Sequence, residues 1–182
     1  MSTAIIDTST ANIASVRFAL ERLGVEPILA RDPDEAARAE RLILPGVGAA
    51  GPAMATLRAR GWTERLQDDV RPLLGVCLGM QLLFDHSEES GADLLGLIPG
   101  QVRRLDPGAA GPWPHMGWNT LEFDAQAHAL LEGVEAGSRV YFVHGFAVEP
   151  GPFAIATTRY GAPVTAIAAK GRVMGCQFHP DR

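Results

Sequence analysis

The pattern with the clearest chemical meaning is Gly75-Val76-Cys77-Leu78-Gly79, which lies between an apolar run and an apolar segment with helical spacing. In a sharp turn from a strand into a helix, glycines on both sides relieve crowding while the central residue projects. The N-terminus of the following helix favours the thiolate, the nucleophilic form of cysteine. The pattern predicts that Cys77 is a nucleophile, although cysteine more often packs as a small apolar residue. Cys176, in the middle of an apolar run, is expected to pack in that way.

A cysteine nucleophile needs a base, and His179 has the most suitable surroundings of the five histidines. The proline in His179-Pro180-Asp181 disfavours helical backbone at the histidine, so positions 179 and 181 are expected to project to one side of an extended segment. The carboxylate of Asp181 can then orient the imidazole for proton transfer from sulfur. A C-terminal turn with a solvated ion pair is the alternative. His144, at the end of another apolar run, is a further candidate for lining the site.

Acyl transfer also needs hydrogen-bond donors directed at the developing oxyanion. The segment Pro45-Gly46-Val47-Gly48 follows an apolar run, and its glycines permit a backbone whose N–H groups, that of Val47 especially, point into a cleft. The N–H of Leu78, which follows the cysteine, is the second natural donor. A plain turn after the strand fits this motif equally well. The sequence contains no Walker A, HExxH or CxxC pattern, so no cofactor and no metal are expected.

The remaining pattern predicts the elements that must position these residues. Apolar runs alternate with helical spacing through the first half: strands are expected at 3–7, 25–29, 41–44 and 72–76, and helices at 12–23, from 32, at 51–60, 62–70 and 78–86. This alternation predicts an α/β fold with three layers, a mostly parallel central sheet flanked by helices. The second half is expected to add an antiparallel extension, with strands at 101–105, 115–123, 139–144, 153–159, 163–169 and 172–178 and a short helix at 127–131.

Composition narrows the class of protein. A chain of 182 residues with 47% apolar residues fits one domain around one core. The net charge of −5, without any run of lysine or arginine, disfavours nucleic acid and anionic membranes as partners. No apolar stretch approaches the roughly 20 residues of a membrane span, and the N-terminus lacks the basic region of a signal peptide. Two cysteines are too few for a disulfide scaffold, so a cytoplasmic protein is expected.

Together these segments resemble the class I (triad) glutamine amidotransferases along the whole chain. The similar segments are the PGVG loop, GVCLGMQLLF around Cys77, and the late FHP followed by an acid. A narrower resemblance is to the glutaminase subunits of imidazole glycerol phosphate synthases, because Pro114–Asn119 reads PHMGWN and Tyr141–His144 reads YFVH. PHMGWN is the more specific motif, since G-x-C-x-G-x-Q is shared with the glutaminases of anthranilate, carbamoyl-phosphate and GMP synthases.

The resemblance implies one glutaminase domain over residues 1–182 with the three-layer fold of this family. It implies that Cys77 attacks the side-chain amide of glutamine and that His179, oriented by Asp181, acts first as base and then as acid. A γ-glutamyl thioester forms, and water then releases glutamate. The amides of Val47 and Leu78 would hold the oxyanion, and the implied substrate-binding residues are Gly46, Gly48, Gln81, Gly145 and Phe146.

The resemblance also implies a partner. Ammonia would pass to a (β/α)₈-barrel cyclase subunit, in a heterodimer that makes imidazole glycerol phosphate in histidine biosynthesis. The implied interface residues are Asn12, His115, Met116, Trp118, Asn119 and Tyr141.

Three segments depart from the family's pattern. Asp181 stands where glutamate is usual, Gly145-Phe146 where Ser-Tyr is usual, and Thr8–Asn12 where Tyr-Gly-x-Gly-Asn is usual. Related chains also continue into one more helix after the His-x-acid motif, so this chain is expected to lack its final C-terminal helix. Three alternatives remain open: a catalytically impaired docking subunit of the same complex, the glutaminase of another synthase, and another cysteine hydrolase on a similar sheet.

Overall fold

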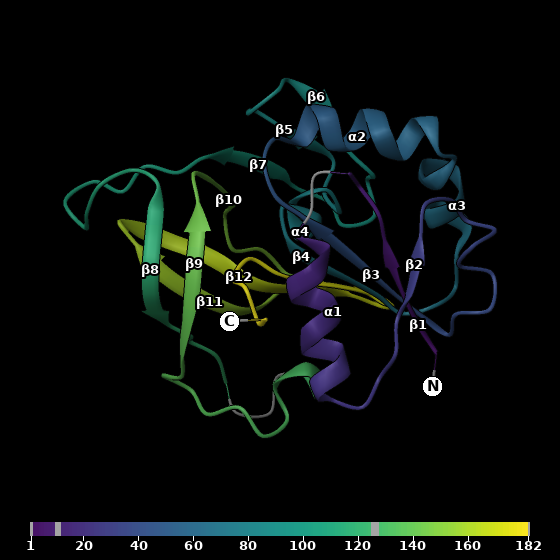
Figure 1. Cartoon of the computed structure of the whole chain (residues 1–182). Helices are drawn as coiled ribbons and strands as arrows, with labels where there is room; N and C mark the ends of the chain where they lie inside the picture. Colours follow the sequence, from purple (N-terminus) through teal and green to yellow (C-terminus); the bar gives the residue numbers. More distant parts are fainter. Residues whose placement is uncertain (1, 10–11, 125–127, 182) are drawn as a thin grey trace.

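A computed structural model describes residues 2–9, 12–124 and 128–181, and its centre is a seven-stranded sheet (Figure 1). The strand order is β11-β12-β13-β4-β3-β1-β2. The bounds are Thr3–Ile6 for β1, Ile28–Ala30 for β2, Arg41–Gly46 for β3, Leu73–Cys77 for β4, Ala154–Tyr160 for β11, Ala162–Lys170 for β12 and Val173–Cys176 for β13. Each pair of neighbouring strands from β13 to β2 is parallel, whereas β12 pairs antiparallel with both β11 and β13. The mostly parallel sheet with an antiparallel extension is therefore confirmed.

Helices cover both faces of the sheet because successive strand residues point to opposite sides. In β1, Ala4 and Ile6 belong to the core on one face, with residues of α2 and α3, whereas Ile5 belongs to the core on the other face, with Val16 of α1. The helices are α1 (Ile13–Arg22), α2 (Ala50–Ala59), α3 (Trp62–Asp68) and α4 (Leu78–Gln81), with a 3₁₀ turn η1 at Ala129–Leu131. The three-layer α/β arrangement is confirmed.

Two smaller sheets border the main sheet (Figure 1). One has the order β10-β7-β5-β6, with bounds Phe146–Val148, Gln101–Arg104, His86–Ser87 and Ala92–Asp93. The other is an antiparallel ladder of β8 (His115–Thr120) and β9 (Arg139–His144). The short strands β5, β6 and β10 were not expected, because two or three residues are too few to show an alternating pattern.

One predicted helix is too long, and another does not form. The helix expected over 78–86 ends at Gln81, because Leu83 and Phe84 donate to carbonyls three residues back, and Leu82 and Phe84 in turn accept from the tertiary segment 95–96. The helix expected from Asp32 is a set of turns, since the Asp32 carboxylate binds the N–H groups of Asp34 and Glu35 without a helix following. Of the helix expected at 127–131, residue 127 lies outside the described residues.

The face that carries α1 has an apolar groove beside that helix. Leu74 of β4 borders three adjoining apolar hollows, two of which also include Leu130 or Leu131 of η1. Within the described residues, none of the helices is both long and apolar enough to cross a membrane.

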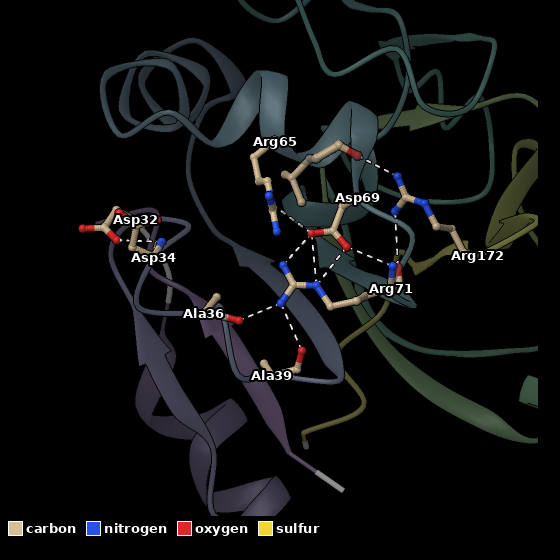
Figure 2. A network of polar contacts seen from close by, with 9 residues as sticks. Asp32, Asp34, Ala36, Ala39, Arg65, Asp69, Arg71 and Arg172 are labelled. Carbon is tan, nitrogen blue, oxygen red and sulfur yellow. Dashed lines mark hydrogen bonds and ion pairs between the residues drawn. The ribbon is translucent and has the colours of Figure 1, made fainter.

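A buried ion pair fixes the amino end of β4 (Figure 2). The Arg71 guanidinium binds the Asp69 carboxylate and also donates to the carbonyl oxygens of Ala36 and Ala39, at 2.6 and 3.0 Å. Arg172, just before β13, donates to the carbonyl oxygens of Leu66 and Arg71. Charged groups removed from water need such partners on every side. The network therefore holds α3, β4 and β13 in register, and β4 ends at Cys77.

We predict that Arg71→Met lowers the free energy of unfolding by about 3 kcal/mol, because the carboxylate of Asp69, whose side chain is 2% exposed, keeps only the exposed Arg65 as a charged neighbour among the described residues. The matched control is Arg65→Met. Arg65 lies 3.5 Å from the same carboxylate, but its side chain is 53% exposed, so its loss is expected to cost less than about 1 kcal/mol. Urea unfolding at neutral pH measures both values, and equal losses for the two variants would contradict the prediction.

The same pair gives a pH dependence. Burial alone would raise the pKa of Asp69, but the hydrogen bonds and charge of Arg71 together outweigh burial and hold that pKa below its ordinary value. A lowered folded-state pKa gives stability that is present above the unfolded pKa of about 4 and is lost as the pH falls through the folded pKa. The stability difference between the native chain and Arg71→Met is therefore expected to narrow below about pH 4.

Candidate active site

The turn between β4 and α4 is strained and very tightly packed. Cys77 has φ 54° and ψ −111°, a left-handed backbone that side-chain-bearing residues rarely adopt. A Cβ at Gly79 would lie 1.7 Å from the Leu44 carbonyl oxygen, and one at Gly75 would lie 2.5 Å from the Gly79 carbonyl oxygen. A Cβ at Gly46 would lie 2.9 Å from the Gly79 nitrogen. Glycine is thus the residue that fits at these places, and the packing holds Cys77 against the end of β3.

The Cys77 thiol is buried and protonated in this conformation. Its sulfur lies 3.9 Å from the Val143 carbonyl oxygen and 3.8 Å from the Gln177 side-chain nitrogen. Burial, and to a smaller extent the charge of Asp181, raise the pKa of the thiol to about 11, because hydrogen bonds from the Leu78 N–H and from Gln177 only partly offset them. From the sequence, the N-terminus of the following helix was expected to favour the thiolate. That expectation is wrong for this conformation, because α4 has only four residues and burial dominates.

His179 and Asp181 lie together, on the segment that follows β13. The N–H of His179 donates to the Tyr141 carbonyl oxygen at 3.0 Å, and His179 Nδ1 lies 3.5 Å from Asp181 Oδ1. The other ring nitrogen, Nε2, is buried and has no hydrogen-bond partner. No hydrogen bond therefore joins His179 to the Cys77 sulfur in this conformation, and Nε2 is free to accept a proton.

Cys77 and His179 open into one cavity of about 360 Å³. Seven other residues singled out from the sequence line it: Val47, Gly48, Leu78, Gln81, His144, Gly145 and Phe146. A smaller cavity of about 140 Å³ adjoins it and shares Val47, Val143 and His179; it includes Asn12, Gly46 and Asp181. The structure thus gathers the expected nucleophile, the expected base and both expected oxyanion segments at the carboxyl edge of the sheet.

The residues expected at a partner interface divide into two groups. Met116 and Trp118 are 62% and 54% exposed, on the outer side of β8, and Trp118 contacts Tyr141 edge-on at 5.7 Å. Asn12 is also exposed, while Asn119 and Tyr141 are half-buried. His115 is 2% exposed, so the expectation that it contacts a partner directly is wrong for this conformation. The alternation of β8 turns its side chain inward.

Two polar residues of the site, Gln177 and Glu89, were not predicted from the sequence. Gln177 accepts a hydrogen bond from Gln81 at 2.9 Å and donates toward the Cys77 sulfur, and nothing in the spacing of the last strand marks it. Glu89 lines the larger cavity, and among the described residues that line it Glu89 alone carries a carboxylate. Its position in an acidic cluster at 85, 88 and 89 was a visible but unspecific signal.

Residues 46–51 have the G-x-G-x-x-G spacing that binds a pyrophosphate at a helix N-terminus in dinucleotide-binding proteins. Here the first amides of α2 are already paired with side chains. The Ala50 N–H donates to the Glu89 carboxylate at 2.9 Å, and the Gly51 N–H donates to the Ser90 hydroxyl at 3.2 Å. A carboxylate at that position repels a phosphate, so the structure disfavours a nucleotide site. Within the described part of the chain, no group of three or more His, Cys, Asp or Glu side chains is arranged to hold a metal ion.

Comparison with known proteins decides the family. The sequence profile described as "Glutamine amidotransferase class-I" matches residues 4–182. The chain is a class I glutamine amidotransferase. It is 50% identical to "Imidazole glycerol phosphate synthase subunit HisH" of Xanthomonas campestris over 98% of this chain and 89% of that protein. The protein of the same description from Xylella fastidiosa gives the same identity and coverage.

Solved structures agree on the fold of this amidotransferase. "Crystal structure of glutamine amidotransferase" has a TM-score of 0.75 at 21% identity, covering 98% of this chain and 90% of that one. "Structure of PurLQS from Thermotoga maritima" has a TM-score of 0.73 at 22% identity, covering 100% and 88%. At these identities the similarity concerns the fold alone.

The buried thiol of this amidotransferase gives a prediction about pH. Only the thiolate reacts with iodoacetamide, and a pKa of about 11 in place of the ordinary 9.0 leaves roughly 100-fold less thiolate at neutral pH. Alkylation of Cys77, followed by mass spectrometry from pH 7 to 10, should be roughly 100-fold slower at pH 7 than that of a free thiol and should rise about tenfold per pH unit over this range. A rate that levels off near pH 8 would contradict the prediction, since it would show that the sulfur has already lost its proton to His179.

Proposed function

We propose that this chain is the glutaminase subunit of an imidazole glycerol phosphate synthase and that Cys77, His179 and Asp181 are its catalytic triad. The observation that carries the proposal is the shared cavity, where a buried thiol and an unpartnered imidazole nitrogen meet two glycine-rich segments that can hold an oxyanion. The 50% identity to proteins with that description selects the synthase among the family's members.

The reaction proceeds in two halves. His179 Nε2 takes the thiol proton as the Cys77 sulfur bonds to the side-chain amide carbon of glutamine, and the N–H groups of Val47 and Leu78 hold the resulting oxyanion. The imidazolium then protonates the departing nitrogen, which leaves as ammonia. A γ-glutamyl thioester remains on Cys77. In the second half, His179 takes a proton from water, the hydroxide bonds to the thioester carbon, and the thiol is restored as glutamate leaves.

The acceptor of the ammonia is proposed to be a (β/α)₈-barrel cyclase subunit, bound in a cytoplasmic heterodimer. Support for its position comes from the exposed side chains of Met116 and Trp118, together with the half-buried Tyr141, on the outer side of the β8–β9 ladder. Exposed aromatic residues and methionine are typical of the core of protein–protein interfaces. His179 connects this surface to the triad, because its N–H binds the Tyr141 carbonyl.

A second candidate function is a docking subunit with impaired catalysis. The observation that favours it is the 3.5 Å separation of His179 Nδ1 and Asp181 Oδ1, longer than an ordinary hydrogen bond. The longer side chain of glutamate could close that distance.

We predict that the chain, mixed with the cyclase subunit and its nucleotide ligand, releases glutamate from glutamine and that Cys77→Ala abolishes this release. Asp181→Glu is expected to raise kcat by no more than about threefold, since at 3.5 Å the aspartate already faces the imidazole. Glutamate is followed with a coupled dehydrogenase assay. If the native chain releases no glutamate but Asp181→Glu does, the result would instead favour the docking subunit. If neither releases glutamate, the proposed glutaminase activity is refuted.

Glutamine also needs a partner for its α-ammonium group, and we propose that Glu89 supplies it. We predict that Glu89→Gln raises KM for glutamine about tenfold or more with a smaller change in kcat, because a charged hydrogen bond to bound substrate is lost. Glu88→Gln is the matched control: Glu88 accepts from the Arg104 N–H at 2.9 Å and does not line the cavity. Steady-state kinetics with the cyclase present compare the two, and an equal effect in both variants would contradict the role of Glu89.

A further inference from the structure

Two buried histidines lie between the ladder strand β8 and the wall of the glutamine cavity. His115 is stacked between Phe142 and Tyr160, with ring centroids 4.7 and 4.0 Å away. His144 is 6% exposed and lines the cavity. His115 Nδ1 and His144 Nε2 are 3.0 Å apart, so one ring donates a hydrogen bond to the other. The mechanism above uses neither ring.

The backbone at each end of this pair decides which nitrogen carries each proton. At the cavity end, His144 Nδ1 lies 2.9 Å from the Phe146 carbonyl oxygen, which can only accept, so Nδ1 carries the proton. Nε2 of the neutral ring is then an acceptor, and His115 Nδ1 must donate to it. Nε2 of a neutral His115 must in turn accept.

At the β8 end, the required donor is present. Asn119 Nδ2 lies 3.3 Å from His115 Nε2 and also donates to the Arg159 carbonyl oxygen at 3.0 Å. The Thr120 N–H donates to Asn119 Oδ1 at 2.8 Å. A carbonyl and an N–H of the main chain thus fix which end of the amide is nitrogen. Each hydrogen bond from Asn119 to Phe146 has one donor and one acceptor, and reversing any ring would leave a mismatch at one end.

The Phe146 carbonyl is where this chain of hydrogen bonds meets the active site. It also accepts from Gln81 Nε2 at 2.9 Å, and the same Gln81 nitrogen donates to Gln177 Oε1 at 2.9 Å. Gln177 in turn donates toward the Cys77 sulfur at 3.8 Å. The position of the Phe146 carbonyl therefore fixes the Gln81 side chain in the wall of the cavity.

The wrong tautomer of His144 would disturb that wall. With its proton on Nε2, the ring would direct a lone pair from Nδ1 at the Phe146 oxygen, and two acceptors at 2.9 Å repel each other. Burial lowers the pKa of both histidines to about 4, so both rings are neutral at physiological pH and each carries a single proton. The repulsion would move the carbonyl away and release Gln81.

We propose that Asn119, His115 and His144 form a positioning relay that holds His144 in the Nδ1–H tautomer and so fixes the Phe146 carbonyl and Gln81 for glutamine. The identity of the ligand rests on the proposed function, whereas the relay itself rests on the hydrogen bonds. None of the three residues is a catalytic residue, because each acts through the Phe146 carbonyl. The relay also gives the inward-facing His115 and the half-buried Asn119 of β8 a shared role.

The test begins with the tautomer, which is independent of activity. Long-range ¹H–¹⁵N NMR spectra of the labelled chain at pH 7 are expected to show both His115 and His144 as Nδ1–H tautomers. A native His144 with its proton on Nε2 would overturn the relay. A chain with the expected tautomers but no glutaminase activity would refute the proposed function and leave the relay standing.

Two variants then alter the relay without removing its surroundings. His115→Phe keeps an aromatic ring between Phe142 and Tyr160 but removes the donor to His144 Nε2. The preference of His144 for the Nδ1–H tautomer is then expected to weaken, because only the Phe146 carbonyl still favours it, and KM for glutamine is expected to rise about fivefold, with kcat within about twofold. Asn119→Asp has nearly the same shape, but its carboxylate accepts where the amide donates. It is expected to move the proton of His115 to Nε2 and that of His144 to Nε2.

The matched control is Tyr160→Phe, which keeps the ring stacked on His115 and removes only the hydroxyl that donates to the Pro112 carbonyl. It should leave the His144 tautomer and KM unchanged. A rise in KM in His115→Phe without a change of tautomer would overturn the relay and assign the effect to packing. Unchanged tautomer and KM would overturn it as well. If His115→Phe does not fold, as judged by circular dichroism, Asn119→Asp decides by the same two readouts.

Discussion

The backbone at Gly79 passes so close to β3 that a Cβ there would lie 1.7 Å from the Leu44 carbonyl oxygen. Much of the site depends on this contact, because it brings the turn that carries Cys77 against the end of β3, from which the PGVG segment leaves the sheet. The strain is local: Cys77 adopts φ 54°, and the packed sheet around it supplies the stabilisation that such a backbone costs. The Asp69–Arg71–Arg172 network fixes the other end of β4, so the strand is held at both ends.

Close packing at this turn has an electrostatic consequence. The same burial that orients the sulfur raises its pKa to about 11, so the resting thiol is a weak nucleophile. His179 Nε2 lacks a hydrogen-bond partner, and His179 Nδ1 stays 3.5 Å from Asp181. The three residues of the proposed triad are therefore neighbours, and no hydrogen bond joins His179 to either of the other two.

The hydrogen bonds in the interior of this region have a fixed donor-to-acceptor direction as well as suitable lengths. From the Arg159 carbonyl to the Cys77 sulfur, three side-chain amides and two histidines follow one another, and the main-chain groups that they contact dictate which atom of each donates. A buried network with every donor matched to an acceptor specifies one arrangement, whereas a mismatched one is costly. Neutral side chains of the amidotransferase thus hold this wall of the cavity. They lie next to the Cys77 thiol, which becomes nucleophilic only when it loses its proton.

The sequence by itself determined the parallel sheet, its antiparallel extension and the edge at which Cys77, Val47 and His179 gather. The reason is local: alternation of apolar runs sets the layers, and only glycine fits the close approaches at positions 75 and 79. Tertiary structure alone decided the length of α4, the burial of His115 and the pKa of Cys77. It also brought in Glu89 and Gln177, which lie 12 and 100 residues from Cys77 in the chain. Burial and hydrogen-bond direction arise from segments distant in sequence, which no local pattern records.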